Sequence, residues 1–310
     1  MKIFLIIIFA LLVLMLVVFA LYLLIGAIAF RFSLSRKGKL KRGIELRNKI
    51  QEKDDKALQE YFSSDNFEKL SIISSDDLKL YGFYKDNGQT RLAILVHGYG
   101  GTHFDMYNYA KIYEDLGYDI FAMDLRTHGE SEGDSLSMGL YEHYDIIKWI
   151  EKLLSIKPNY KIVLHGISMG ASTVCMTLGE ILPNNVICGI EDSGYDNANN
   201  ELYYVYSRAK FLSKWFYKIF YHYTKNTKGL DLKAIDACEK LKNLKLPVLF
   251  IHGDSDNFVP TSMVYKLYDC IPDSRRALYI GKDATHIKSI EVNFQEYKKQ
   301  VSKFISKYNM

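Results

Sequence analysis

Hydrophobic side chains form one long uninterrupted run at the start of the chain and then recur in short blocks separated by polar segments. Between Ile3 and Phe30 no charged residue occurs, and nearly every side chain is aliphatic or aromatic. As a helix this run would measure about 42 Å at 1.5 Å per residue, which exceeds the roughly 30 Å hydrocarbon core of a bilayer. The pattern therefore predicts a transmembrane anchor over residues 1–30.

A cleaved secretory signal is the competing interpretation of this run, because residues 27–29 (AIA) have the small side chains of a cleavage site. The apolar stretch is well beyond the roughly 7 to 15 residues of such signals. A single lysine precedes it, and a strongly basic segment follows it. These features favour a retained anchor.

The basic segment after the anchor sets the expected orientation. Residues 31–56 carry ten Lys or Arg against four Asp or Glu, a local net charge of +6, whereas the whole chain carries only +4. The remaining chain is therefore mildly acidic, which argues against a nucleic-acid partner. Basic residues beside a membrane helix favour its cytoplasmic side. We expect a basic juxtamembrane stalk over 31–64, amphipathic and helical over 44–62, followed by a cytoplasmic globular domain.

Beyond residue 65, apolar blocks of strand length alternate with helical patterns. The first two blocks have no helix between them and indicate an antiparallel hairpin, whereas the later alternation is typical of a parallel sheet covered on both faces. The sequence thus predicts an α/β domain over 65–310, with a mostly parallel eight-stranded sheet flanked by helices. The expected strands are 69–73, 78–84, 92–97, 119–123, 161–165, 186–190, 248–252 and 276–280, and the expected helices are about 104–116, 139–156, 169–182, 261–270 and 288–307.

Composition and cysteine spacing narrow the classes of protein. The chain is 48% hydrophobic and 14% aromatic, which is too apolar for a disordered polymer. Its four cysteines include no Cys-x-x-Cys pair, so they indicate neither a disulfide framework nor a structural zinc site. We interpret all four as buried thiols and expect neither a metal nor an organic cofactor. The four are Cys175, Cys188, Cys238 and Cys270.

The most informative motif is Gly166-Ile167-Ser168-Met169-Gly170, which stands between a buried strand and a helix rich in small residues. A Gly-x-Ser-x-Gly segment in this position makes a sharp turn that exposes the serine hydroxyl. Side chains at the two glycines would collide with the neighbouring strand and helix. Ser168 is therefore the candidate nucleophile.

A serine hydroxyl is a weak nucleophile at neutral pH and needs a base, usually a histidine oriented by a carboxylate. His165 and His252 belong to strand ends, where packing or local hydrogen bonding is the favoured role, and several other histidines lie on helical patterns. His286 stands in a loop between the last strand and the C-terminal helix. We expect His286 to be the base.

The carboxylate is expected after the penultimate strand, where two acids compete. Asp254 adjoins the strand-ending glycine and is suited to bonding backbone amides in a turn. Asp256 lies two residues further out and is the preferred partner of the histidine. Asp192, after the preceding strand, is a third candidate.

The chain order Ser168, Asp256, His286 and three further motifs together resemble the α/β-hydrolase superfamily over roughly residues 65–310. Residues 97–101 (HGYGG) stand where that family has its His-Gly oxyanion loop. Two further loops, residues 124–131 (DLRTHGES) and the Gly-x-x-Asp-x-x-Val-Pro match at 253–260, resemble loops of the same family. Within it, the chain looks most like the monoacylglycerol-lipase and serine-aminopeptidase-like branch and like membrane-anchored bacterial hydrolases.

The resemblance also implies where the negative oxygen of a reacting carbonyl is stabilised. By position, the donors are the backbone N–H groups of Tyr99, in the glycine-rich loop, and of Met169, at the start of a helix. We expect the 124–131 loop to be structural, with Arg126 and His128 tying neighbouring loops together.

Substrate choice is expected in the insertion over residues 194–245, which is too long for a loop and rich in aromatic side chains. Aromatic and aliphatic residues recur at helical spacing between 211 and 223, which predicts an amphipathic cap helix. Its apolar face either only packs onto the core or also lines an acyl pocket or touches lipid. We expect Tyr195, Trp215 and Phe216 to contact the substrate.

The sequence thus predicts a membrane-anchored serine hydrolase that cleaves a small ester with a hydrophobic acyl group through an acyl-enzyme. Its second partner is the lipid bilayer. A serine aminopeptidase on the same fold would need an acid to bind the substrate amine, and Glu201 or Asp196 is placed for that in the cap. An acyltransferase is a further alternative. A catalytically silent membrane-tethered binding module is the alternative from another class, against which an intact triad argues.

Overall fold

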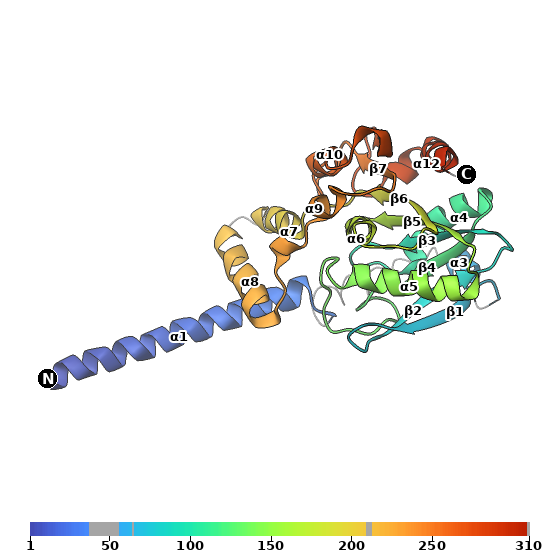
Figure 1. Cartoon of the computed structure of the whole chain (residues 1–310). Helices are drawn as coiled ribbons and strands as arrows, with labels where there is room; N and C mark the ends of the chain where they lie inside the picture. The colour runs from blue at the N-terminus through green and yellow to red at the C-terminus, as the bar shows by residue number, and fades with distance from the viewer. Residues whose placement is uncertain (37–55, 64, 209–212, 309–310) are drawn as a thin grey trace.

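A computed structural model describes residues 1–310 except 37–55, 64, 209–212 and 309–310. One long N-terminal helix, α1 (Lys2–Ser33), projects from a body in which helices surround a central sheet (Figure 1). The expected helical stalk at 44–62 falls mostly outside the described residues. Its end contains the short helix α3 (Lys56–Tyr61).

The central sheet has eight strands in the order β1-β2-β4-β3-β5-β6-β7-β8. Strand β2 runs antiparallel to both of its neighbours, and the other neighbouring pairs are parallel. The prediction of a mostly parallel sheet that begins with a hairpin is therefore confirmed. The strands are β1 (Glu68–Ile73), β2 (Lys79–Lys85), β3 (Arg91–Val96), β4 (Asp119–Met123), β5 (Lys161–Ile167), β6 (Val186–Asp192), β7 (Val248–Gly253) and β8 (Arg276–Gly281).

Helices cover both faces of the sheet because its central strands are apolar on both sides. In β3, Leu92, Ile94 and Val96 enter one core cluster, while Ala93 and Leu95 enter the other. Side chains of α5, α6 and α10 fill the first core, and those of α4, α11 and α12 fill the second. These helices are α4 (Tyr107–Asp115), preceded by the 3-10 turn η2 (His103–Met106), α5 (Glu142–Ile156), α6 (Met169–Leu178), α10 (Ser262–Asp269), followed by the 3-10 turn η4 (Asp273–Arg275), α11 (Ser289–Val292) and α12 (Phe294–Tyr308).

The segment between β6 and β7 forms a helical cap, as expected for residues 194–245. Its first helix begins after Asn197, whose side chain accepts a hydrogen bond from the Asn199 N–H and so caps the helix. Its second helix buries Tyr217, Phe220 and Tyr223. The cap elements are α7 (Ala198–Ser207), α8 (Ser213–Lys228), the 3-10 turn η3 (Leu232–Ala234) and α9 (Ala237–Leu241).

Within the described residues, α1 is the helix that is long and apolar enough to cross a membrane. Most of its side chains are exposed, but Gly26 and Phe30 are buried near its C-terminal end. A Cβ added at Gly26 would come within 2.5 Å of the Tyr223 Cβ, so the glycine lets α1 approach α8 closely. The C-terminal part of α1 thus docks onto α8 of the cap (Figure 1). The helix ends at Ser33, three residues past the expected boundary at residue 30.

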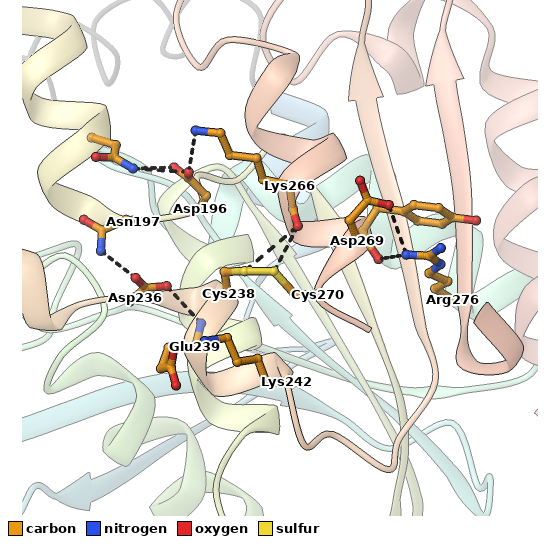
Figure 2. Close-up of a disulfide and its surroundings, with 12 residues drawn as sticks. Asp196, Asn197, Asp236, Cys238, Glu239, Lys242, Lys266, Asp269, Cys270 and Arg276 are labelled. Carbon is orange, nitrogen blue, oxygen red and sulfur yellow. Dashed lines mark hydrogen bonds and ion pairs between the residues drawn. A yellow bond between two sulfur atoms is a disulfide. The ribbon is translucent and has the colours of Figure 1, made fainter. Parts of the chain in front are cut away.

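The interpretation of all four cysteines as buried thiols is wrong for two of them. Cys175 and Cys188 are buried and free, but Cys238 and Cys270 form a disulfide with their Cα atoms 5.7 Å apart (Figure 2). The bond joins α9 of the cap to the C-terminal end of α10. Spacing along the chain gives no sign of this pair, because the two cysteines are 32 residues apart. Strand β7 lies between their helices in the sequence, so the helices come together only in the folded protein.

Replacing both residues, Cys238→Ser with Cys270→Ser, is expected to lower the free energy of unfolding of the purified, oxidised protein by about 3 kcal/mol, because the bond restricts the unfolded chain. For a domain of this size, that loss lowers the unfolding midpoint by roughly 6 to 12 °C. Thermal unfolding in detergent measures the shift, and wild-type protein with reductant should match the double variant. An unchanged midpoint in both samples would contradict a stabilising disulfide.

Candidate active site

Ser168 stands at a strained turn between β5 and α6. Its backbone has φ 52° and ψ −123°, a conformation that side-chain-bearing residues rarely adopt. The Ser168 N–H donates to the Asp192 carbonyl at 2.8 Å. A Cβ added at Gly166 would lie 2.2 Å from the Gly170 carbonyl oxygen, and one at Gly170 would lie 2.3 Å from the Val96 carbonyl oxygen. The motif therefore forms the expected elbow, in which only glycine fits on either side of the serine.

Three side chains from separate loops form one chain of hydrogen bonds. The Ser168 Oγ lies 2.8 Å from His286 Nε2, and His286 Nδ1 lies 2.7 Å from Asp256 Oδ2. The other carboxylate oxygen of Asp256 accepts the backbone N–H groups of Phe258 and Val259 at 2.8 and 3.0 Å. These bonds fix the carboxylate, so the imidazole that it orients is directed at the serine hydroxyl.

The geometry separates the three acids that the sequence left open. Asp256 contacts His286, whereas Asp254 is exposed and accepts a bond from the hydroxyl of the next residue. Asp192 is fully buried and accepts the Tyr297 hydroxyl at 2.8 Å. Only Asp256 among them bonds directly to the imidazole.

A second histidine, His252, also contacts Asp256. Its Nε2 lies 3.2 Å from Asp256 Oδ2 and 3.0 Å from the Val259 carbonyl oxygen, so this nitrogen donates. Burial favours a higher pKa for Asp256, but the bonds from the two histidines outweigh it and hold that pKa well below its usual range. Burial likewise opposes a charge on His252, yet Asp256 and Glu191 raise its pKa.

The sequence indicated packing or local hydrogen bonding for His252, and its bonds to Asp256 and to the Val259 carbonyl agree with that. What the sequence did not indicate is that the local acceptor is the carboxylate that orients His286. One feature of the sequence was compatible with this contact. His252 stands near the end of β7, four residues before Asp256. At that spacing, the Asp256 side chain can reach His252 at the end of β7 only if the loop between them turns tightly. The pattern of residues does not show that turn.

Two other buried histidines lock the loop after β3 against the loop after β4. The Leu125 N–H donates to His97 Nε2 and the Gly100 N–H donates to His128 Nε2, each at 3.0 Å. Burial lowers the pKa of His128, which keeps its Nε2 unprotonated and able to accept. Arg126 pairs with two carboxylates from other segments. These contacts fit the structural role expected for residues 124–131.

The expected oxyanion donors lie beside the serine. Tyr99 and Met169 line the same cavity as Ser168. Met169 begins α6, where N–H groups of the first turn have no partner inside the helix and the helix dipole favours negative charge. A Cβ added at Gly98 would lie 2.9 Å from the Ser168 Cβ, so the loop that carries Tyr99 abuts the elbow.

A cavity of about 380 Å³ opens over Ser168, within the range of small-molecule sites. Its wall is mostly apolar and combines the sheet edge, the cap and the end of α1. Tyr195, one of the three residues expected to contact the substrate, lines this cavity. The lining residues are Phe32, Ser33, Tyr99, Met138, Ser168, Met169, Tyr195, Glu201, Leu202, Val205, Tyr206, Phe258 and Val259.

Trp215 and Phe216 do not line this cavity, contrary to the expectation from the sequence. Both lie in the first turn of α8 and are exposed, Trp215 by 50% and Phe216 by 37%. The later turns of the same helix bury Tyr217, Phe220 and Tyr223. The helix is amphipathic as predicted, but apolar side chains of its first turn are exposed, whereas those of its later turns are buried.

Glu201 is an acidic group in the otherwise apolar wall. Its side chain is buried, and within the described structure neither carboxyl oxygen has a hydrogen-bond partner. Burial, together with the charges of Asp256 and Asp196, raises the pKa of Glu201 to about 8. Asp196, the other acid proposed for the cap, is already paired with Lys266 at 3.1 Å (Figure 2).

This arrangement has the parts of nucleophilic acyl transfer. It places a hydroxyl against an imidazole and a carboxylate behind that imidazole, with Tyr99 and Met169, the expected oxyanion residues, in the wall of the same cavity. In the described part of the chain, no group of three or more His, Cys, Asp or Glu side chains is arranged to hold a metal ion.

Known proteins resemble this chain at the level of sequence and of fold. Residues 93–233 match the family model of the α/β hydrolase fold. The Bacillus subtilis protein YqkD is 27% identical over 84% of this chain and 87% of its own length. The zebrafish lysophosphatidylserine lipase ABHD12 is 26% identical over 59% of this chain and 47% of its own length, so the chain spans about half of that relative.

Among solved structures, the Pyrococcus furiosus esterase Pf2001 superposes with a TM-score of 0.65 and 25% identity, covering 78% of this chain and 93% of the esterase. The sheet order, the serine elbow and the family match agree with one another. The chain has the α/β-hydrolase fold, and these findings together support the α/β-hydrolase superfamily.

Proposed function

We propose that this chain is a membrane-anchored serine hydrolase that cleaves carboxylic esters with a hydrophobic acyl group. The observation that carries the proposal is the unbroken set of hydrogen bonds from Ser168 through His286 to Asp256 beneath an apolar cavity. The fold and the esterase neighbour support a hydrolase. A relative that is a lysophosphatidylserine lipase supports a lipid ester.

The reaction follows from the geometry. His286 Nε2 takes the Ser168 proton as Oγ attacks the ester carbonyl, and the Tyr99 and Met169 N–H groups bind the resulting oxyanion. The imidazolium, stabilised by Asp256, returns the proton to the leaving alcohol and leaves an acyl-serine. Water, deprotonated by His286, then attacks the acyl carbon and regenerates Ser168 with release of the acid.

Wild-type protein is expected to react covalently with a fluorophosphonate probe, because that probe traps a serine activated by a neighbouring base. Ser168→Ala is expected to abolish labelling and to reduce hydrolysis of p-nitrophenyl butyrate by at least about 10³-fold. Gel fluorescence and release of p-nitrophenol measure the two effects. Absence of labelling in folded wild-type protein would support the silent binding module instead.

A pair of aspartates two residues apart supplies the matched control. Asp256→Asn is expected to slow labelling by at least about 100-fold, since the imidazole loses the carboxylate that orients it. Asp254→Asn is expected to label within about twofold of wild type, because Asp254 is exposed and does not contact His286. Equal rates in the two variants would contradict the assigned role of Asp256.

A serine aminopeptidase is the second candidate, and the unpartnered carboxyl of Glu201 in the cavity wall is the observation that favours it. An α-amino group has a pKa near 8, close to the raised pKa of Glu201. An ion pair between them needs the carboxyl ionised and the amine protonated. Such binding would therefore be strongest near pH 8 and would weaken on either side.

We expect wild-type protein to hydrolyse p-nitrophenyl acyl esters at least about 100-fold faster than aminoacyl p-nitroanilides, because the cavity wall is mostly apolar. Comparison of kcat/KM for the two substrate series tests this. Faster anilide turnover that peaks near pH 8, is lost in Glu201→Gln and is kept in Asp196→Asn would establish the aminopeptidase. Asp196→Asn is the control because Asp196 already pairs with Lys266.

The proposed anchor is α1, and the proposed side of the globular domain is the cytoplasm. The basic segment that follows α1 favours this side by the positive-inside rule. The Cys238–Cys270 disulfide opposes it, since disulfides persist mainly in oxidising compartments. On a cytoplasmic domain the pair would be reduced in the cell and would oxidise after purification.

A membrane-impermeant maleimide is expected to leave Cys238 and Cys270 unmodified in intact cells and to modify them after permeabilisation, because both are partly exposed. A mass shift on gels measures the modification, with the double serine variant as background. Modification of reduced intact cells would instead place the domain outside and favour the disulfide as its native state.

A further inference from the structure

The end of the membrane-spanning helix forms part of the wall around the candidate nucleophile. Phe32 and Ser33 of α1 line the Ser168 cavity. The Tyr99 hydroxyl donates to the Ser33 carbonyl at 2.7 Å, and the Ser33 Oγ lies 2.9 Å from the Tyr206 hydroxyl. The anchor is therefore built into the site and is more than a tether.

A second cavity of about 350 Å³ lies further back along the same helix. It is lined by Ile25, Ile28 and Ala29 of α1 together with Tyr206 of α7 and Phe216 of α8. Tyr206 also lines the Ser168 cavity, so this one side chain borders both cavities. From Ile25 to Phe32 the helix rises about 10 Å, which makes the second cavity a neighbour of the first along α1.

The way α1 docks explains why one side of this cavity stays open. One face of the helix packs tightly on α8, with the Phe30 and Tyr223 ring centroids 6.3 Å apart and Gly26 pressed against Tyr223. Ile28 points elsewhere and remains 48% exposed. In Figure 1, α8 lies across the end of α1 where that helix leaves the body. This second cavity is therefore a crevice between α1 and the cap, and its open side is next to the exposed surface of α1.

We propose that this crevice is a lateral access route, through which the acyl chain of a bilayer lipid ester slides from the membrane to Ser168. The proposal rests on the serine-hydrolase function and on α1 as the anchor. All the crevice residues except Tyr206 are purely hydrocarbon. Phe216 is one of them and is exposed, and the ring of the exposed Trp215 lies 5.3 Å from the Phe216 ring. Tryptophan is enriched at membrane–water interfaces.

The physical advantage of the route is that the acyl chain never crosses water. Each methylene that passes from lipid into water carries an unfavourable free energy, so a long-chain ester has a high barrier to reaching a cavity open only to solvent. In a crevice that runs along the anchor, the acyl chain exchanges its contacts with lipid for contacts with equally apolar protein side chains. The expected substrate is accordingly a lipid ester that resides in the bilayer.

Full-length protein reconstituted in phosphatidylcholine vesicles tests the route with two substrates. One is 1-oleoylglycerol mixed into the vesicles, and the other is water-soluble p-nitrophenyl butyrate. Ala29→Trp fills the crevice and is expected to slow oleoylglycerol hydrolysis at least tenfold, while butyrate turnover changes by less than about twofold because Ala29 does not line the Ser168 cavity. Ile28→Trp, at a half-exposed position, should act in the same direction.

Ala20→Trp is the matched control, since Ala20 is an exposed alanine of α1 that lines neither cavity. It should leave both rates as in wild type. The route is overturned if both crevice variants hydrolyse oleoylglycerol at the wild-type rate, if they slow both substrates equally, or if Ala20→Trp slows oleoylglycerol hydrolysis as much. Wild-type protein that turns over neither substrate and takes up no fluorophosphonate would refute the serine-hydrolase function itself, which is a different result.

Discussion

The hydrogen bond between Ser168 Oγ and His286 Nε2 is the contact on which the site depends. It joins residues 118 positions apart at a distance of 2.8 Å. Parallel strands make such a contact possible, because the carboxyl ends of β5, β7 and β8 lie at the same edge of one sheet. The strained backbone at Ser168 then directs the hydroxyl away from the sheet, where the loop after β8 can reach it. The rest of the fold holds these loops in place.

Much of that holding is done by buried imidazoles. His97 and His128 accept backbone N–H groups from each other's loops, and His252 donates to Asp256 from below. An ionised carboxylate in a buried site is stable only when hydrogen bonds replace the water that it has lost. Asp256 has four such donors, two from backbone and two from histidines. This explains why it remains an anion beside the apolar cavity, whereas Glu201, without a described partner, favours its protonated form.

The cavity owes its shape to three parts of the chain that have no local relation to one another. The sheet edge supplies the reacting groups, α7 supplies Glu201 and Tyr206, and α1 supplies Phe32 and Ser33. Because α1 packs against α8 through Gly26 and Tyr223, the helix proposed as the anchor is coupled to the cap. The helix proposed to attach the protein to the membrane therefore also lines the cavity at Ser168 and the crevice proposed for substrate access.

The sequence by itself determined the fold class, the turn at Ser168 and the choice of His286 as the candidate base, but it left three candidate acids, of which the structure places Asp256 against the imidazole. Each of these follows from a local pattern: apolar blocks of strand length, glycines where no side chain fits, and polar residues directly after strands. Other features were decided only by the tertiary structure. They include the Cys238–Cys270 bond, the contact of His252 with Asp256, the exposure of Trp215 and Phe216, and the place of α1 in the cavity wall. Each of these features depends on how segments that are distant in the sequence pack against one another. The periodicity of apolar residues along the chain does not encode that packing.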